Sequence, residues 1–307
     1  MGVRSSADSL EEIRRCISAH ARPDLASPID GLLLSRVLGA GSPDYSLTEP
    51  LLVVMVQGGK RLHLGDRVYE YRAGQYLIVT ANLPVTGRYL GADEVPSLAM
   101  GLVLRPAALA MLMLRARSTP RTRSTTGSSA MATGRADADL LDAVARMLRL
   151  LDSPADAAVL APLTEQEILW RLLTGPHGDM IRQIGLADSD LSHLNTAIGW
   201  MRDNYAEPAR IEDLARMCGM STSAFHRHFR TVTAMSPLQF QKRIRLQQAR
   251  SLLVAHPGDI AGVGHRVGYD SPSQFTREYR RLFGAPPGQD AARLRSGGGS
   301  PDPVQFP

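Results

Sequence analysis

The sequence predicts an α+β chain with two domains: an N-terminal β-barrel with flanking helices, and an all-α C-terminal domain that contains two helix-turn-helix motifs. Two observations predict this division. Short apolar runs separated by turn residues follow one another from about residue 30 to residue 104, whereas the last third of the chain repeats one helical pattern about fifty residues apart. The length of 307 residues, about twice that of a typical domain, fits two hydrophobic cores.

Residues 1–29 are expected to form a helical extension. Charged and apolar residues alternate in residues 1–19, which does not fit a signal peptide or an anchor. No apolar run elsewhere approaches the length needed to cross a bilayer. The only cysteines, Cys16 and Cys218, lie far apart in the sequence and suggest no disulfide framework. We therefore expect a cytoplasmic protein without a membrane partner.

Residues 30–117 are expected to form the barrel domain. The pair Gly65-Asp66 between two apolar runs marks a hairpin turn, and residues 106–117 have a helical pattern. A compact antiparallel barrel, or half of one, is the simplest closure for so many short strands. The strands are expected at residues 51–56, 61–64, 68–71, 76–80, 85–90 and 98–104.

Three further segments lie outside the barrel and the repeat. Residues 118–136, rich in Ser, Thr, Gly and Arg, are expected to be a flexible loop, and residues 296–307 a disordered tail. Residues 137–189 are expected to be a helical section for dimerisation or linkage. An apolar stripe opens it, and the capping-box spacing of Thr164 and Glu167 then predicts the start of a helix that stops at Gly175-Pro176.

Residues 190–295 contain the repeat, in which apolar residues return at helical spacing on two successive helices. Gly219 or Gly268 after the first helix permits a sharp turn, and Ser221 or Ser271 then caps the second helix. Residues 237–255 join the two copies and predict one long helix. The matched residues of the first copy are Ile211, Ala215 and Cys218, whose counterparts in the second copy lie 49 positions later, and Ser223, Phe225, Arg227 and Pro237, whose counterparts lie 50 positions later.

The outward face of each second helix carries hydrogen-bond donors, not core residues. The major groove of DNA admits one helix, and arginine grips guanine with both arms. Residues 1–189 hold 20 Lys and Arg against 20 Asp and Glu, whereas residues 190–307 hold 15 against 10, so the whole net charge of +5 lies in the repeat region. The alternative interpretation is a helix bundle whose arginines only keep it soluble. That interpretation does not explain why the turn, the arginine and the spacing from Phe to Pro all recur together in the two copies. We therefore expect double-stranded DNA to be contacted by Ser221, Ser223, His226, Arg227, Arg230, Ser273, Gln274, Thr276, Arg277 and Arg280.

The repeat region contains the motifs Ile211-Glu-Asp-Leu-Ala215, Phe225-His-Arg-His-Phe229, Ser236-Pro237, Val267-Gly-Tyr-Asp-Ser271, Gln274-Phe-Thr-Arg277 and Phe283-Gly-Ala-Pro286. Over about a hundred residues this pattern closely resembles the AraC/XylS family of transcription regulators. Pro272 replaces a polar residue that some relatives use for contact, and proline is tolerated early in a helix. The resemblance implies base reading by Ser223, His226 and Arg227 in the first motif and by Ser273, Thr276 and Arg277 in the second.

The strand region contains Gln57-Gly58, Gly65-Asp-Arg-Val-Tyr-Glu70, Ala73-Gly-Gln-Tyr76 and Asn82-Leu-Pro-Val-Thr-Gly87. These segments resemble the N-terminal domain of one AraC subfamily, which implies a cupin-like barrel. In relatives whose N-terminal domain dimerises, helices of that domain pair with the same helices of a second chain. The helices expected in residues 137–189 either pack on the barrel or pair with a second chain in this way. We expect a homodimer.

Enzymatic cupins bind a metal through several histidines and a glutamate. Here His63 is the only histidine of the strand region, and Glu70 lacks the partners of such a site, so we expect no metal and no cofactor. The barrel instead offers a dimer surface or a pocket for a small-molecule effector. Arg88 would suit an anion, although Asn82 and Gly87 are equally explained by a turn. The residues expected to line the pocket are Tyr76, Asn82, Thr86 and Arg88.

The combined reading is a sequence-specific transcription regulator of the AraC type, an activator by resemblance, with RNA polymerase as a partner. The chain has no nucleophile elbow, phosphate-binding loop or dinucleotide motif, so no enzyme is expected. Two alternatives stay open. One is an architectural DNA-binding protein that answers no effector, and the other is a metal-cupin enzyme fused to a DNA reader.

Overall fold

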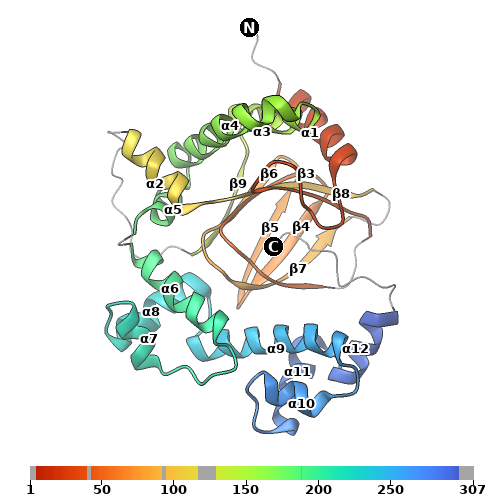
Figure 1. Cartoon of the computed structure of the whole chain (residues 1–307), viewed down its shortest axis with the longest axis vertical. Helices are drawn as coiled ribbons and strands as arrows, with labels where there is room; N and C mark the ends of the chain where they lie inside the picture. The colour runs from red at the N-terminus through yellow and green to blue at the C-terminus, as the bar shows by residue number, and fades with distance from the viewer. Residues whose placement is uncertain (1–4, 40–42, 92–94, 117–128, 188, 297–307) are drawn as a thin grey trace.

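The computed structural model describes residues 5–39, 43–91, 95–116, 129–187 and 189–296. Figure 1 shows a β-barrel in the middle of the molecule, a layer of helices above it and the C-terminal helices below it. The upper layer consists of α1 (Ser6–His20), α3 (Ala138–Arg149) and α4 (Pro154–Thr174), with α2 (Pro106–Arg115) and α5 (Gly178–Gly185) at its side.

The barrel is built from two antiparallel sheets. One has the strand order β1-β8-β3-β6-β9 and the other the order β2-β7-β4-β5. The strands of the first sheet are β1 (Leu32–Val37), β8 (Ser97–Val103), β3 (Leu51–Gln57), β6 (Gln75–Val79) and β9 (Met131–Arg135). Those of the second are β2 (Asp44–Leu47), β7 (Pro84–Leu90), β4 (Gly59–Leu64) and β5 (Arg67–Arg72).

The two sheets differ in how they are covered, and their sequences reflect it. Residues Leu51 to Val56 of β3 and Ser97 to Leu102 of β8 are all buried, because helix α1 packs on the outside of these strands while the barrel core lies inside. In β4 and β7, buried and more exposed residues largely alternate, as expected for a sheet with one face turned away from the core. The strand predictions at residues 51–104 are confirmed, and Gly65, with φ of 60°, occupies the predicted hairpin turn.

Strand β9 falls within the segment that was expected to be a loop. It pairs with β6 from Gln75↔Arg135 to Val79↔Met131, so backbone hydrogen bonding at a sheet edge forms it without any alternation of side chains. At Gly134 a side chain would lie within 2.5 Å of the Tyr76 hydroxyl, so this close approach requires glycine. The expected loop residues 118–128 and tail residues 297–307 lie outside the described residues.

Helix α4 also differs from the expected one. The capping-box prediction was wrong, because the helix begins at Pro154 and continues through Pro162. Thr164 is therefore inside the helix, where its hydroxyl donates to the Leu160 carbonyl at 2.9 Å. The predicted stop at Gly175 is confirmed, and α3 buries the predicted apolar stripe.

The C-terminal domain contains the predicted pair of helix-turn-helix units joined by one long helix, α9 (Pro237–Ala255). In Figure 1, α9 runs across the bottom of the molecule between the first unit and the second. The first unit includes α6 (Asp190–Asp203), α7 (Ile211–Met217) and α8 (Thr222–Thr233). The second includes α10 (Ile260–Arg266), α11 (Pro272–Phe283) and α12 (Pro287–Ser296). No helix among the described residues is long and apolar enough to span a membrane.

The buried apolar residues form two clusters, and the boundary between them lies within α9. The first cluster extends from Ile13 through the barrel to Ile244 and includes the core of the first helix-turn-helix unit. The second cluster begins at Leu246 and contains the core of the second unit. The first unit is therefore packed into the barrel domain, whereas the second has a core of its own.

The ends of α8 and α11 show the repeat at backbone level. Each helix ends in the left-handed conformation, at Ala234 with φ of 56° and at Gly284 with φ of 79°. A residue with a Cβ is strained in this conformation, whereas glycine is not.

Replacement of Ala234 by glycine should therefore raise the free energy of unfolding by about 1 kcal/mol. Urea denaturation followed by circular dichroism measures the change. Gly284→Ala, at the matching position of the second unit, should have the opposite effect. An unchanged or lower stability of Ala234→Gly would contradict the strain argument.

Candidate nucleic-acid interface

The two predicted reading helices, α8 and α11, are matched in length and in the way they are held. Both have twelve residues. The side chains of Ser221 and Ser271 cap them by accepting from the backbone nitrogens three residues on, each at 3.3 Å. Gly219 and Gly268 take positive φ in the preceding turns, as predicted. Aromatic pairs one turn apart, Phe225–Phe229 and Phe275–Tyr279, anchor the two helices.

The outward faces of α8 and α11 carry arginines without acidic partners. In the described part of the chain, no carboxylate lies within 4.0 Å of Arg227, Arg230, Arg277 or Arg280. All four side chains are exposed, so they can pair with an external anion. Ser221, Ser223, His226 and Ser273 are exposed too, and Thr276 is half-buried.

Two of the nearby polar residues are more constrained than the sequence implied. Gln274 donates to Glu278 at 3.2 Å, and Glu278 also accepts from Lys242 of α9 and from Tyr269. The amide of Gln274 is therefore partly engaged within the protein. His228 lies 3.5 Å from Asp190 of α6, whereas His226 is exposed, so the two histidines point in different directions as expected.

Helix α9 fixes the second unit through a buried ion pair. Arg250 lies 2.9 Å from Asp290, which is fully buried and also accepts from the Tyr279 hydroxyl at 3.0 Å. Burial raises the pKa of the Asp290 carboxyl, but the hydrogen bond from Arg250 and the other donors outweigh burial and lower it. A lowered carboxyl pKa contributes stability above the ordinary value of 3.8, and this contribution is lost as the pH falls through the lowered pKa.

Arg250 and Asp290 were not singled out in the sequence. Arg250 is spaced four residues after Leu246 and three before Leu253, both of which are buried. A charged residue on the apolar side of a helix was the available signal for a buried ion pair.

The chain shares its fold with ToxT of Vibrio cholerae over most of its length. An apo structure of a ToxT variant matches with a TM-score of 0.56 and 10% identity, covering 88% of this chain and all of that one. A structure of wild-type ToxT with a bound unsaturated fatty acid matches with a TM-score of 0.54 and 10% identity, covering 87% of this chain and 97% of that one.

Two family models match consecutive parts of the sequence. The model of the AraC-type transcriptional regulator N-terminus matches residues 28–180, and a helix-turn-helix domain model matches residues 214–293. The chain belongs to the AraC family of transcriptional regulators. Both domains of the family are thus present in the order that the sequence predicted.

Two curated relatives are transcriptional activators named RhaS. The RhaS of Citrobacter koseri is 25% identical over 149 residues, which are 48% of this chain and 53% of that protein. The RhaS of Escherichia coli strain SE11 is 26% identical over 110 residues, which are 36% of this chain and 39% of that protein. The chain spans about half the length of the first relative and less of the second.

The four residues predicted to bind an effector lie on β6, on β7 and in the connection between these strands. Tyr76 is buried in β6, and burial raises the pKa of its hydroxyl. Thr86 and Arg88 lie two apart on β7, where Val85 and Tyr89 point into the core. Thr86 faces α9 and accepts from it, Arg88 is exposed, and Asn82 lies in the connection before β7.

The candidate metal residues are also apart or engaged. His63 is exposed on β4, and the Glu70 carboxylate forms ion pairs with Arg61 at 2.8 Å and Arg72 at 2.6 Å. Hydrogen bonds from these arginines lower the pKa of Glu70. Among the described residues, no three His, Cys, Asp or Glu side chains are grouped as metal ligands.

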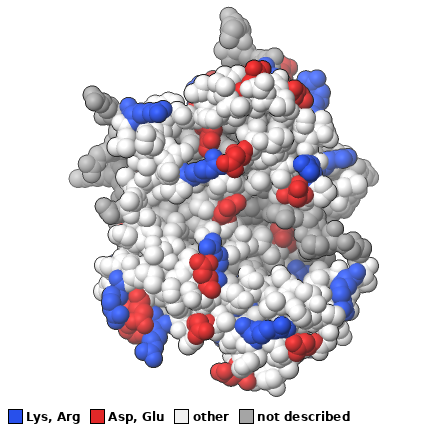
Figure 2. All heavy atoms as spheres, in the orientation of Figure 1, with Lys and Arg blue, Asp and Glu red and all other residues white. Residues whose placement is uncertain are grey.

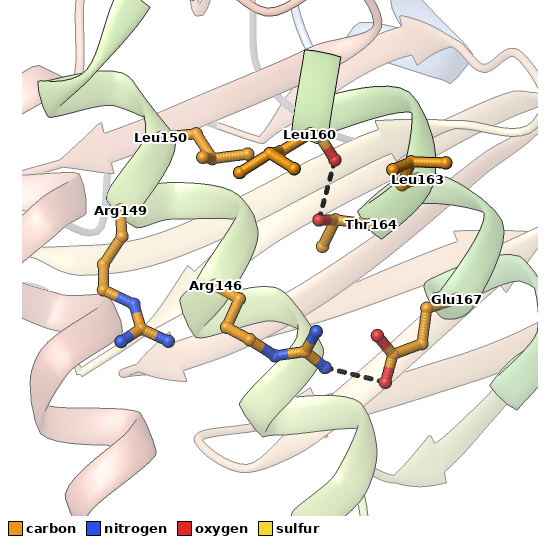
Figure 3. Close-up of a pocket in the computed structure, with 7 residues that line it drawn as sticks. All are labelled: Arg146, Arg149, Leu150, Leu160, Leu163, Thr164 and Glu167. Carbon is orange, nitrogen blue, oxygen red and sulfur yellow. Dashed lines mark hydrogen bonds and ion pairs between the residues drawn. The ribbon is translucent and has the colours of Figure 1, made fainter. Parts of the chain in front are cut away.

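A groove lies between α3 and α4 in the N-terminal domain. Figure 3 shows Arg146 and Arg149 of α3 opposite the α4 side chains, with Arg146 paired to Glu167 at 2.7 Å. The hollow measures about 360 Å³. On the outside of α4, Val159, Leu163 and Trp170 are 66%, 58% and 38% exposed, which leaves an apolar stripe beside the groove.

Loss of Arg250 should destabilise the second unit. Arg250→Met should lower the free energy of unfolding by about 3–5 kcal/mol, because Asp290 would stay buried without its main partner. The double variant Arg250→Met/Asp290→Leu removes both charges and should recover most of this loss. Urea titration of both variants measures the difference, and equal losses would show that the buried charge is not the cause.

Proposed function

We propose that this chain is a sequence-specific DNA-binding regulator of transcription that acts in the cytoplasm. The observation that carries the proposal is the pair of matching helices α8 and α11, each with exposed arginines that lack an acidic partner among the described residues. Arg227 corresponds to Arg277 and Arg230 to Arg280, and α9 joins the two units. Two such helices fit two major-groove segments about one helical turn apart.

The relatives favour activation over repression. Both RhaS proteins are named transcriptional activators, so we propose activation, with RNA polymerase as a partner. The family consists of transcriptional regulators, and we propose no enzymatic activity for this chain. Burial raises the pKa of the Cys218 thiol to about 11, so this cysteine is a poor nucleophile at neutral pH.

An architectural DNA-binding protein is the competing proposal. Phosphate contacts would dominate its affinity, so DNA protection would be diffuse and would vanish as salt is raised. Figure 2 shows basic and acidic side chains mixed on the face it presents, with no broad basic surface there for such binding. A footprint on the DNA upstream of the gene, against excess unrelated DNA, separates the two proposals.

We also propose that two copies associate through α4. The apolar stripe of Val159, Leu163 and Trp170 lies beside the groove between α3 and α4, so two copies related by a two-fold axis can each place the stripe against the groove of the other. Such an isologous contact uses the same surface on both chains. It would cover side chains that are otherwise left to water.

Substitution of the reading arginines should change sequence preference as well as affinity. Arg227→Ala and Arg277→Ala should each cost about 1–3 kcal/mol at one base-pair position and relax the preference there. Binding to a set of single-base operator variants measures this. Arg266→Ala, on α10 and paired with Asp259, is the matched control and should bind like the unmodified protein. An equal loss on every sequence would make Arg227 and Arg277 phosphate contacts.

A charge placed in the stripe of α4 should prevent association. Leu163→Arg should give a monomer in analytical ultracentrifugation at concentrations where the unmodified chain is a dimer, because the added cation would face Arg146 and Arg149 in the groove of the other copy. Val68→Arg is the control, since Val68 is 55% exposed on β5, and it should remain dimeric. A monomeric unmodified chain, or a dimeric Leu163→Arg variant, would contradict the proposed interface.

A further inference from the structure

A hollow of about 410 Å³ lies where the barrel meets the DNA-binding domain. Its wall includes the hairpin turn between β4 and β5 of the barrel together with parts of α8, α9 and α11, helices that lie below the barrel in Figure 1. The volume falls within the range of about 300–1,000 Å³ that is common for small-molecule sites.

The charged residues of the hollow are unbalanced. Four basic side chains, Arg230, Lys242, Arg243 and Arg281, line it with only two acidic ones, Asp66 and Glu278, an excess of two positive charges. Lys242 is paired with Glu278 at 2.9 Å. Within the described residues, no carboxylate lies within ion-pair distance of the three arginines. The hollow therefore attracts anions.

Arg243 is the least satisfied of these groups. Its Nη2 donates to Thr86 Oγ1 at 2.5 Å, but its Nε is buried and has no hydrogen-bond partner among the described residues. Burial also lowers the pKa of the guanidinium. A desolvated cation without an acidic partner is unfavourable, and an anion bound beside it would relieve that cost.

We propose that this hollow binds a small organic anion, a carboxylate or a phosphate, whose charged group pairs with Arg243 and with Arg230 and Arg281 at the rim. Guanidinium groups pair with both kinds of anion through two parallel hydrogen bonds. The rest of the ligand would contact the apolar part of the wall, formed by Met235, Leu246 and Leu282.

Such a ligand would touch the barrel, α9 and both reading helices at once. Thr86, predicted as an effector contact, holds Arg243 from the barrel side, while Arg230 extends from the end of α8. Binding would therefore favour one arrangement of the two domains over others. Only the description of the ligand as an effector rests on the proposed function; the binding itself does not.

The test measures thermal stability of the full chain in sodium phosphate or sodium succinate against sodium chloride of equal ionic strength. At least one of the two anions should raise the melting temperature of the unmodified protein by about 2–4 °C. Arg243→Gln should lose this rise. Arg281→Gln changes an exposed side chain of the hollow and should weaken it, whereas Arg36→Gln, exposed on β1, should keep it. The two salts separate a phosphate ligand from a carboxylate one.

A second measurement distinguishes this site from a DNA phosphate contact. If Arg243 pairs with DNA, Arg243→Gln should reduce the slope of log affinity against log salt on a random duplex by about 0.9. The proposal predicts an unchanged slope in buffers without phosphate or carboxylate. A reduced slope, no rise with either anion, or an equal rise in Arg243→Gln would each overturn it. Because the melting experiment contains no DNA, a failure of DNA binding would leave its result unaffected.

Discussion

One face of α9 contacts the barrel, and the helix itself joins the first helix-turn-helix unit to the second. Arg243, Gln247 and Arg250 lie at positions i, i+4 and i+7 of the helix and so point the same way. Gln247 donates to backbone carbonyls of β2 and β7 at 3.3 and 3.4 Å, and the Arg250 guanidinium lies 4.9 Å from the ring of Tyr45 in β2. The spacer between the reading helices is thus also the surface on which the barrel rests.

The arginines of this chain show that residue type alone does not assign a role. Arg245 donates to three backbone carbonyls between α6 and α7 and to the Gly268 carbonyl between α10 and α11, so it holds both connections against α9. Arg250 neutralises a buried carboxylate, whereas Arg227 and Arg277 have no acidic partner in the described residues. Only the structure separates these uses, because the partners come from distant parts of the sequence.

The predictions that succeeded rest on local chemistry. The turn at Gly219, the cap at Ser221 and the uninterrupted helix α9 depend on neighbouring residues alone. Strand β9 depends on the edge of β6, which is distant in the sequence. Helix α4 begins at Pro154, a residue favoured in the first helical turn, so the helix has already started before Thr164. The residues predicted to contact DNA lie on or next to two short helices, and most of them are exposed. The four effector candidates lie on β6, on β7 and in the connection between these strands. The roles of both sets stay predictions.

The division of the apolar core has a consequence for how the protein can move. The backbone nitrogen of Ala130 donates to the Val232 carbonyl, so the first unit is tied to the barrel by hydrogen bonding as well as by a shared core. The second unit has its own core and meets the barrel through Tyr45, whose ring packs on Phe283 at 4.7 Å. Movement relative to the barrel should therefore concentrate in the second unit. If both units bind DNA as proposed, the first would keep a fixed orientation to the barrel, and the second could adjust to the neighbouring major-groove segment.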